Sequence, residues 1–402
     1  MKPTNLTGRR GAALACALAA LVAAAGCVST MPAAEGETTA GVTTIKGGIG
    51  TTGTPQAVQL TDAQKASASA SEFYRVREIG KAIEQYYRAI SLDPKLAEAY
   101  HGLAHIYLVE TQEFDKALAL YEQARVIDPK DVYSKTALAY AYSVVGRHQD
   151  SVNEYVEAAR LAPESADVFL NLGYVYEKMQ MDLAALNSYR RASELTPDDP
   201  RAAQALAQIC YRAELYDQAI SAFEVVRAYG SASQYVLSTL GYCYLRVGAY
   251  PKAELLFLAV LQQNPQDFAA RANLATAYRS MEQYGKAVEQ YEALVAQSPT
   301  DATYLSALAD AYNDAGQYDS AISTARRMLT LMPSSGAPYI PWAKALEKQG
   351  RYQDAIAQLE KATRDPQWKT FALKEIERQN TLIEIAEQRK LRHIWDQGDQ
   401  GN

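Results

Sequence analysis

Apolar and small residues recur with a helical period along most of this chain, and the arrangement itself returns every 34 residues. Residues 166–199 show it most clearly. Leu172 and Tyr176 stand four residues apart, and Ala185 and Tyr189 repeat that spacing after a polar break. Side chains four residues apart lie on one face of an α-helix. The segment therefore predicts two short amphipathic helices joined by a turn, without the alternation that strands require.

The same register holds over a long stretch of sequence. The position of Leu172 carries leucine in six segments spaced 34 residues apart, namely Leu138, Leu172, Leu206, Leu240, Leu274 and Leu308. A period held this long indicates a repeat protein, in which each helix pair buries its apolar face on its neighbours. Less regular units flank these: one at 61–95, one beginning at Ala97 with an extra residue near 110–113, and a last one around 342–362. We therefore predict about nine helix–turn–helix units.

The spacing within each unit resembles that of a known family. The residues that carry it in the clearest unit are Phe169, Leu172, Gly173, Tyr176, Ala185, Tyr189, Ala192 and Pro197. This pattern resembles the tetratricopeptide repeat, with Phe169 where tryptophan is usual. The resemblance covers roughly residues 61–366 and implies an all-α superhelical solenoid. It also implies a scaffold that binds peptides or proteins along a groove lined by the first helices.

The end of the array predicts a capping element. Asp365 and Pro366 supply an N-cap and a first-turn proline for one long helix that runs to about Trp395, before Gly398. Such a helix covers the apolar face that a terminal repeat leaves open. The expected parts are a leader at 1–26, a lipidated N-terminus and tether at 27–60, the repeat array at 61–365, and the capping helix and tail at 366–402.

The N-terminal sequence predicts a targeting segment. Lys2, Arg9 and Arg10 precede an uncharged run from Gly11 to Ala25, which is too short to span a bilayer comfortably and fits a secretory signal peptide. The run ends in Ala-Ala-Gly before Cys27, which resembles a bacterial lipobox. The resemblance implies that Cys27 is lipidated and becomes the new N-terminus; plain secretion and a cytoplasmic protein are the alternatives.

The segment after the leader predicts a tether and a location. Residues 28–60 are rich in Thr, Gly, Ala and Ser without a helix or strand period, which is typical of a disordered linker. Val28 follows the cysteine where aspartate would favour the inner membrane in enteric bacteria. By that analogy, we expect a lipid-anchored protein of the cell envelope, held at the outer membrane and facing the periplasm.

Charge and cysteine content narrow the function. The net charge is −6, and loss of the three leader cations would make the chain more acidic still, which argues against nucleic acid as the main partner. Cys210 and Cys243 stand alone on predicted helices. We expect two buried thiols that pack as small apolar groups, with a disulfide between neighbouring repeats as the alternative.

No motif for catalysis or cofactor binding is present. The sequence lacks a Walker loop, an HExxH motif, a nucleophile elbow and paired CxxC motifs, so we expect no enzyme, no cofactor and no metal. His101 and His105 lie four residues apart with Glu98 one turn earlier, which is a spacing that metal ligands can use. We favour polar residues lining a groove for these two histidines.

Tyrosine is the informative residue type, with 28 tyrosines against 7 phenylalanines. Most fall at three recurring positions, those of Tyr176, Tyr189 and Tyr216, which we interpret as structural. The resemblance implies that other first-helix positions line the groove, and these hold Tyr133, Tyr140, Tyr174, Gln204, Gln208, Tyr211, Tyr235 and Tyr242. Tyr140, Tyr174 and Tyr242 share one repeat position and should form an aromatic row. The alternative is amphipathic residues with no partner.

The family's clamp for C-terminal carboxylates is not implied. It needs lysine and asparagine at groove positions that here hold residues such as Thr136, Tyr140, Gln204 and Gln208. We therefore expect a membrane-anchored scaffold that binds peptide segments or partner proteins in its groove, in the assembly of a pilus, secretion or polysaccharide-export machine. The alternatives are direct glycan binding within polysaccharide export and an enzyme with an unrecognised site.

Overall fold

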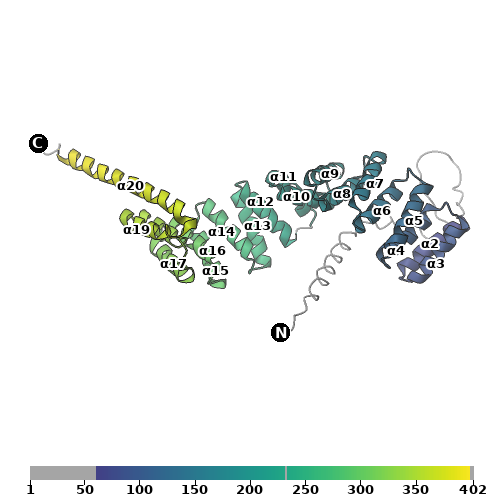
Figure 1. The fold of residues 1–402 in the computed structure, drawn as a ribbon, viewed down its shortest axis with the longest axis horizontal. Coiled ribbons are helices and arrows are strands. Elements are labelled where there is room, and N and C mark those ends of the chain that lie inside the picture. Colours follow the sequence, from purple (N-terminus) through teal and green to yellow (C-terminus); the bar gives the residue numbers. More distant parts are fainter. Residues whose placement is uncertain (1–59, 231–232, 399–402) are drawn as a thin grey trace, which may run out of the picture. The chain divides into compact units, whose positions relative to one another are not determined.

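The structure, a computed structural model, describes residues 60–230 and 233–398, and for residues 389–398 it describes the backbone only (Figure 1). These residues form nineteen helices, and no strand occurs among them. The predicted all-α fold is therefore confirmed. The predicted leader, Cys27 and all but the last residue of the tether lie outside the described residues.

The helices follow one another with short connections (Figure 1). Their bounds are α2 Asp62–Arg75, α3 Ile79–Leu92, α4 Ala97–Val109, α5 Phe114–Ile127, α6 Val132–Val144, α7 His148–Leu161, α8 Ala166–Lys178, α9 Asp182–Leu195, α10 Pro200–Arg212, α11 Tyr216–Ala228, α12 Gln234–Arg246, α13 Tyr250–Gln263, α14 Phe268–Ser280, α15 Tyr284–Gln297, α16 Ala302–Asp314, α17 Tyr318–Leu331, α18 Tyr339–Lys348, α19 Tyr352–Ala362 and α20 Pro366–Gly398.

The chain divides into two compact units, residues 1–141 and 142–402, and the division falls within α6. In the first unit, α2 packs on α3, α3 on α4, and α4 on α5. In the second unit, each helix from α7 to α20 packs on the next. Both units are thus built from contacts between sequence neighbours, which is how repeat proteins obtain a core.

The predicted core positions are buried. Leu172 is 6% exposed and Tyr189 is 2% exposed, and a Cβ on Gly173 would lie 2.6 Å from a ring carbon of Tyr189. The first and second helix of this unit therefore approach closely because Gly173 has no side chain. Leu206 differs from its equivalents because it is only partly buried.

Every first helix of the described residues except α4 ends in the same hydrogen-bonded turn. After α8, the Met181 amide donates to the Tyr176 carbonyl at 2.9 Å, and Gln180 between them has φ 59°. This is a Schellman ending, in which one residue adopts the left-handed region. Glycine fills that position in some turns, such as Gly248, but five turns use a side-chain residue: Arg77, Gln112, Gln180, Glu214 and Glu282.

The connection between α4 and α5 holds the predicted extra residue. It covers four residues, 110–113, and the Glu113 amide donates to the Tyr107 carbonyl at 2.8 Å, so the closing bond spans one residue more than elsewhere. Gln112 still takes the left-handed conformation, with φ 57°. The insertion is therefore absorbed within the turn, and both helices keep their lengths.

The predicted start of the capping helix is confirmed. One Asp365 carboxylate oxygen accepts from the Gln367 amide at 3.0 Å, and the other accepts from the Gly336 amide at 2.8 Å. Asp365 therefore caps α20 and also fixes the loop before α18. Ala372 and Gln379 on α20 are buried. None of the described helices combines the length and apolar composition that crossing a membrane requires.

A tyrosine-lined candidate binding surface

The structure divides the predicted groove residues between the two units. Tyr133 and Tyr140 lie on α6 in the first unit. In the second unit, Tyr174 lies on α8 and Tyr242 on α12, and Gln208 holds the same repeat position on α10 between them. Within the second unit, the expected row is therefore tyrosine, glutamine, tyrosine rather than an unbroken aromatic line.

Tyrosines from α10, α11 and α12 gather into one cluster. The rings of Tyr211 and Tyr242 lie 6.0 Å apart at 82°, and those of Tyr216 and Tyr242 lie 6.3 Å apart at 71°. Tyr235 is 54% exposed, and its hydroxyl is close enough to affect that of Tyr211. Edge-to-face pairs of this kind hold aromatic rings in place. We call Tyr211, Tyr216, Tyr235 and Tyr242 the tyrosine wall.

The helix periods explain why these side chains meet. On α10, Gln204, Gln208 and Tyr211 follow one face at helical spacing, while Ala207 and Cys210 on the other face are buried. On α12, Tyr235 and Tyr242 stand two turns apart, and the intervening core is formed by other residues of the helix. The wall therefore lies at the edge of the core: Tyr211 and Tyr242 are partly buried and pack against it, whereas Tyr235 is exposed.

Tyr216 reaches the wall by a different route. It is the first residue of α11, directly after the turn in which Glu214 has φ 58°. The sharp turn brings its ring against Tyr242. Sequence reasoning placed Tyr216 among the purely structural tyrosines, and that interpretation missed its contact with the candidate surface.

Arg246 contacts two rings of the wall. Its guanidinium lies 4.6 Å above the Tyr216 ring and 5.7 Å above the Tyr242 ring, and it donates to the Tyr242 hydroxyl at 2.9 Å. The hydrogen bond with Tyr242 raises the pKa of Arg246 further above its ordinary value. Glu214 lies 4.0 Å from the same guanidinium. A cation placed over two rings limits their motion.

Tyr211 and Tyr216 keep their hydroxyl protons at neutral pH. Burial raises the pKa of Tyr211, and the neighbouring hydroxyl of Tyr242 raises it further. Partial burial also raises the pKa of Tyr216, against the opposing effect of Arg246. Because both pKa values move upwards from an already alkaline value, these hydroxyls remain hydrogen-bond donors as well as acceptors.

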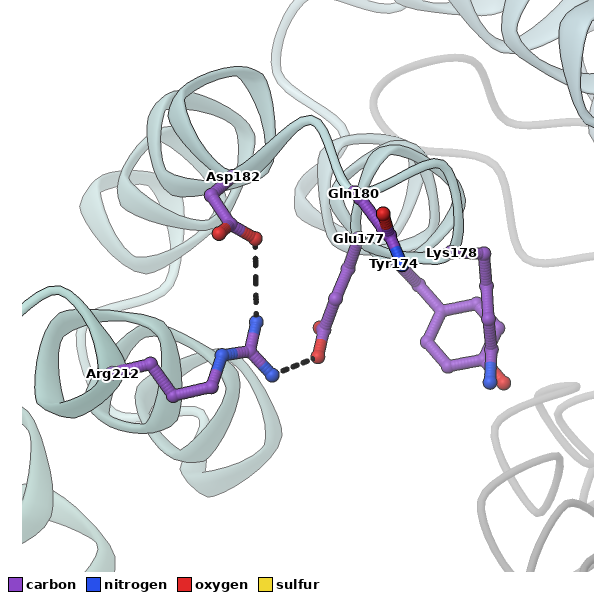
Figure 2. A pocket seen from close by; sticks show the side chains of 6 residues that line it. All are labelled: Tyr174, Glu177, Lys178, Gln180, Asp182 and Arg212. Atoms are coloured by element: carbon purple, nitrogen blue, oxygen red, sulfur yellow. Dashed lines mark hydrogen bonds and ion pairs between the residues drawn. The ribbon is translucent and has the colours of Figure 1, made fainter.

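A hollow of about 650 Å³ opens beside the wall, lined by α8, the start of α9 and the end of α10. Figure 2 shows Arg212 reaching towards both Glu177 and Asp182, with Tyr174 and Lys178 side by side. Arg212 lies 2.6 Å from Glu177 and 3.7 Å from Asp182. The Lys178 ammonium lies 5.0 Å from the centre of the Tyr174 ring. The hollow is therefore polar and its charges are largely matched.

The sequence analysis missed the basic residues of this surface. Lys178, Arg212 and Arg246 occupy one repeat position in three consecutive units. Their 34-residue spacing could have predicted a basic row beside the tyrosines. The counter-ions were harder to foresee, because Glu177 lies on the preceding first helix and Asp182 on the preceding second helix.

The equivalent face further along the second unit has a different composition. The Arg279 guanidinium lies 2.5 Å from Asp314, and Lys344 lies 3.0 Å from Asp314 and 3.9 Å from Asp310. These four residues come from α14, α16 and α18, and all are partly buried. We call Arg279, Asp310, Asp314 and Lys344 the charge seam.

The first unit places its predicted residues around a buried histidine. His101 is 6% exposed; its Nε2 lies 2.9 Å from Ser134 Oγ, and Ser134 donates to Asp131 at 2.6 Å. Since the Ser134 proton goes to Asp131, His101 Nε2 must carry the hydrogen that it shares with Ser134. Tyr133 lies edge-on to His101 at 4.8 Å between ring centres.

These three residues resemble a catalytic serine, histidine and aspartate only in composition. Ser134 is fully buried, and it donates its proton to Asp131 while it accepts from His101, the reverse of what a nucleophilic serine needs. Burial lowers the pKa of His101 to about 4, so the ring is neutral at neutral pH. The arrangement ties α4 to the start of α6, which is a structural role.

The two histidines do not converge on one point. His101 Nε2 is held by Ser134, and the ring of His105 meets that of Tyr74 edge-on at 5.8 Å. Burial lowers the pKa of His105. In the part of the chain that the structure describes, no three His, Cys, Asp or Glu side chains are grouped as metal ligands would be.

The expected buried thiols are confirmed. Cys210 and Cys243 are both free and buried. Burial raises the pKa of each, that of Cys243 to about 11, so both remain thiols at neutral pH. Because the thiolate is the reactive form, neither cysteine is an activated nucleophile.

Comparison with family models decides the identity of the repeats. Models described as tetratricopeptide repeat or TPR repeat match residues 73–109, 99–133, 166–199, 183–234, 216–268 and 244–311. A model of subunit 3 of the anaphase-promoting complex, or cyclosome, matches residues 280–362. The matches fall on the helix pairs described above.

The chain is a tetratricopeptide repeat protein. Proteins of this family are generally non-enzymatic scaffolds that bind peptides or partner proteins, and the fold seen here supports protein–protein interaction in that general sense. Three residues of the tyrosine wall, Tyr211, Tyr235 and Tyr242, lie on first helices of the tetratricopeptide repeats, at positions that the resemblance assigned to the groove. The fourth, Tyr216, begins a second helix. A comparison with curated protein sequences gave no match.

Solved structures of other proteins are similar to this chain at low identity. Pseudomonas aeruginosa PilF is 18% identical over 52% of this chain and 95% of its own, with a TM-score of 0.45. YrrB, described as having an unusual peptide-binding site, is 23% identical over 46% and 95%, with a TM-score of 0.40. The Naa15/Naa10 complex bound to HypK is 15% identical over 79% and 51%, with a TM-score of 0.46. Values of this size say nothing about what the present chain binds.

Proposed function

We propose that this protein is a lipid-anchored scaffold of the bacterial cell envelope that holds partner proteins or peptide segments on the first helices of its repeats. Its expected setting is the assembly of an envelope machine, such as a pilus, secretion or polysaccharide-export system. It acts by binding, without catalysis and without a cofactor or metal.

The tyrosine wall carries this proposal. It combines four tyrosines with Arg246, and Tyr235 exposes half of its side chain although it stands beside the other rings. Tyrosine and arginine are enriched among residues that dominate binding energy at interfaces. Rings already fixed by edge-to-face contacts and by a cation lose little freedom when a partner binds.

The envelope setting is supported by the sequence before residue 60. A basic start, an uncharged run and Ala-Ala-Gly before Cys27 together resemble a lipoprotein leader. Acyl chains on Cys27 would keep the repeats at a membrane surface, since each buried methylene contributes about 0.8 kcal/mol to membrane affinity.

The binding surface is tested by affinity capture of the native, membrane-extracted protein followed by mass spectrometry. The decisive variant carries Tyr211→Ala together with Tyr242→Ala. We expect it to lose specific partners that the unaltered chain captures, while its circular dichroism remains helical. Capture of the same partners in the same amounts by a folded variant would show that they bind elsewhere.

The anchor is tested separately by Cys27→Ser. We expect the native chain in the membrane fraction and the variant in the soluble periplasmic fraction. A native chain that is soluble, or a variant that stays with the membrane, would contradict the lipoprotein interpretation without affecting the binding surface.

A further inference from the structure

The tyrosine wall offers hydrogen-bond donors to an incoming chain. The Tyr242 hydroxyl already accepts from Arg246, so its own proton remains available to donate. Gln204 and Gln208 on the same face of α10 add side-chain amide groups, each with two donor hydrogens and one acceptor oxygen. A ligand with exposed carbonyl oxygens can accept from these donors.

The wall and the adjacent hollow carry no net charge. Lys178, Arg212 and Arg246 supply three positive charges, and Glu177, Asp182 and Glu214 supply three negative ones. Arg212 donates a hydrogen bond to Glu177, so a carboxylate from a partner would have to displace that contact. Neither an acidic nor a basic partner is favoured by such a surface.

The ring geometry suits a small, flat, apolar group. The rings of Tyr211 and Tyr242 are nearly perpendicular, so the edge of one ring points at the face of the other and the two rings form a corner. Arg246 already lies over the Tyr216 and Tyr242 rings, and Lys178 lies over Tyr174. Broad stacking of sugar rings on these tyrosines would compete with those cations, whereas a proline ring needs only the corner.

We propose that the tyrosine wall binds an extended, uncharged, proline-rich segment of a partner protein. Such a segment adopts the polyproline II conformation, whose carbonyls are exposed and whose prolines have no N–H to satisfy. Aromatic-lined surfaces take up preformed segments of this kind at low entropic cost. The inference rests on the proposed binding function and specifies the chemistry of the partner at that surface.

The experiment measures binding of four blocked probes to the full chain by isothermal titration calorimetry. The probes are a peptide of about ten residues rich in proline and alanine, the same peptide with aspartate replacing the alanines, a proline-free alanine–glycine peptide, and a neutral oligosaccharide. We expect the uncharged proline-rich peptide to bind at least about ten-fold more tightly than each of the others.

Two sets of variants locate the binding. Tyr211→Ala with Tyr242→Ala should weaken binding of the proline-rich peptide about ten-fold or more, and Tyr242→Phe should weaken it less because it removes only the hydroxyl. The matched pair is Tyr216→Ala and Tyr318→Ala. Both residues begin a second helix at the same repeat position, but only Tyr216 contacts the wall, so only its loss should weaken binding.

The outcomes separate this inference from the proposed function. Preference for the acidic peptide or for the oligosaccharide overturns the inference, as does equal weakening by Tyr216→Ala and Tyr318→Ala. If a captured partner depends on the wall but binds through a segment without proline, the inference fails and the scaffold function stands. If wall variants capture every partner unchanged, the proposed binding surface itself fails.

Discussion

The tyrosine wall and the charge seam use the same repeat positions for different chemistry. The position of Tyr242 on α12 holds Asp310 on α16 and Lys344 on α18. In the wall, this position holds the partly buried ring of Tyr242. In the seam, Asp310 and Lys344 approach each other at 3.9 Å, and Asp314 binds both Lys344 and Arg279. The repeat framework fixes where side chains stand, and a few substitutions decide whether they face a partner or one another.

The ionisation of the seam shows that it is a closed arrangement. Burial raises the pKa of Asp314, but hydrogen bonds from Arg279 and Lys344 outweigh burial and bring it below its ordinary value. Burial raises the pKa of Asp310, which lacks such hydrogen bonds, although the charge of Lys344 opposes the rise. The charges of the seam are satisfied internally, so it offers a partner less than the wall does.

The largest predicted effects test whether the two regions share one kind of core. Leu172→Ala and Leu308→Ala remove the same repeat side chain, which is 6% exposed in the first case and 5% in the second. Each should lower the free energy of unfolding by about 2–5 kcal/mol, because both create a cavity between packed helices. Since long repeat arrays need not unfold as one unit, hydrogen exchange of neighbouring amides is the better measurement. A loss below about 1 kcal/mol at either site would contradict its core position.

Acidification should lower the stability of the first unit through its buried His101 and should leave the tyrosine wall unaffected. The pKa of His101 is about 4 in the folded chain and near 6.5 when unfolded, so the unfolded state binds the extra proton between these values. The contribution of His101 to the free energy of unfolding should therefore be fully present above pH 6.5. It should fall by up to about 3 kcal/mol as the pH decreases towards 4. Exchange of α4 and α6 amides followed against pH measures this.

His101→Gln is the control for the acid effect. It removes the titrating ring, so the pH dependence of α4 and α6 exchange should flatten, while Asp131 keeps its carboxylate at the start of α6. The peptide affinity of the wall should be unchanged from pH 7 to 5, because the pKa values of Tyr211, Tyr216 and Arg246 are raised further above this range. A slope that survives His101→Gln would assign the acid effect to another group.

Removing one charge from each region should affect the two regions differently. Asp314→Asn deprives Arg279 and Lys344 of their shared carboxylate and should cost about 1–3 kcal/mol of stability, because those hydrogen bonds involve charged, partly buried groups. Arg212→Gln removes an ion pair that is 46% exposed on the arginine side and should cost at most about 1 kcal/mol. Thermal denaturation of both variants under identical salt measures the difference; equal losses would contradict the distinction between wall and seam.

The smallest predicted changes in stability concern the turns before α11, in the wall, and before α17, near the seam. The two turns have the same backbone conformation but different residues at the left-handed position. Glu214 before α11 has φ 58°, and Gly316 before α17 has φ 75°. Gly316→Ala should cost about 1 kcal/mol, because a side chain disfavours this conformation. Glu214→Gly should change stability by no more than about 0.5 kcal/mol, since relief of that strain is offset by greater freedom in the unfolded chain. Chemical denaturation resolves the two; a large loss for Glu214→Gly would reveal a further role for Glu214.

The sequence was sufficient for the parts of the fold that each repeat specifies locally. The 34-residue spacing placed Leu172 and Tyr189 in the core, and the extra residue near 110–113 and the cap at Asp365 were read correctly. These features depend on spacing and on side chains close in sequence. The left-handed residue of each turn was not foreseen, because Gln180 and Glu214 occupy it as readily as glycine.

The candidate site was only partly predictable, because its contacts join different repeats. Tyr211 and Tyr242 were expected on groove positions, and the structure places them side by side. The contribution of Tyr216 and the stacking of Arg246 depend on how the turn before α11 directs one ring against the next helix. Pairing in the charge seam likewise depends on the approach of α14, α16 and α18, which no single repeat encodes.

The turn between α4 and α5 has a practical consequence for engineering the protein. It already accepts one additional residue by lengthening a single hydrogen-bonded loop, while the flanking helices keep their pairing. Exposed loops with this freedom tolerate further insertion. A short epitope or fluorophore-binding tag placed next to Gln112 would give a handle for imaging and purification in the first unit, separate in sequence from the proposed lipidation site at Cys27 and from the tyrosine wall.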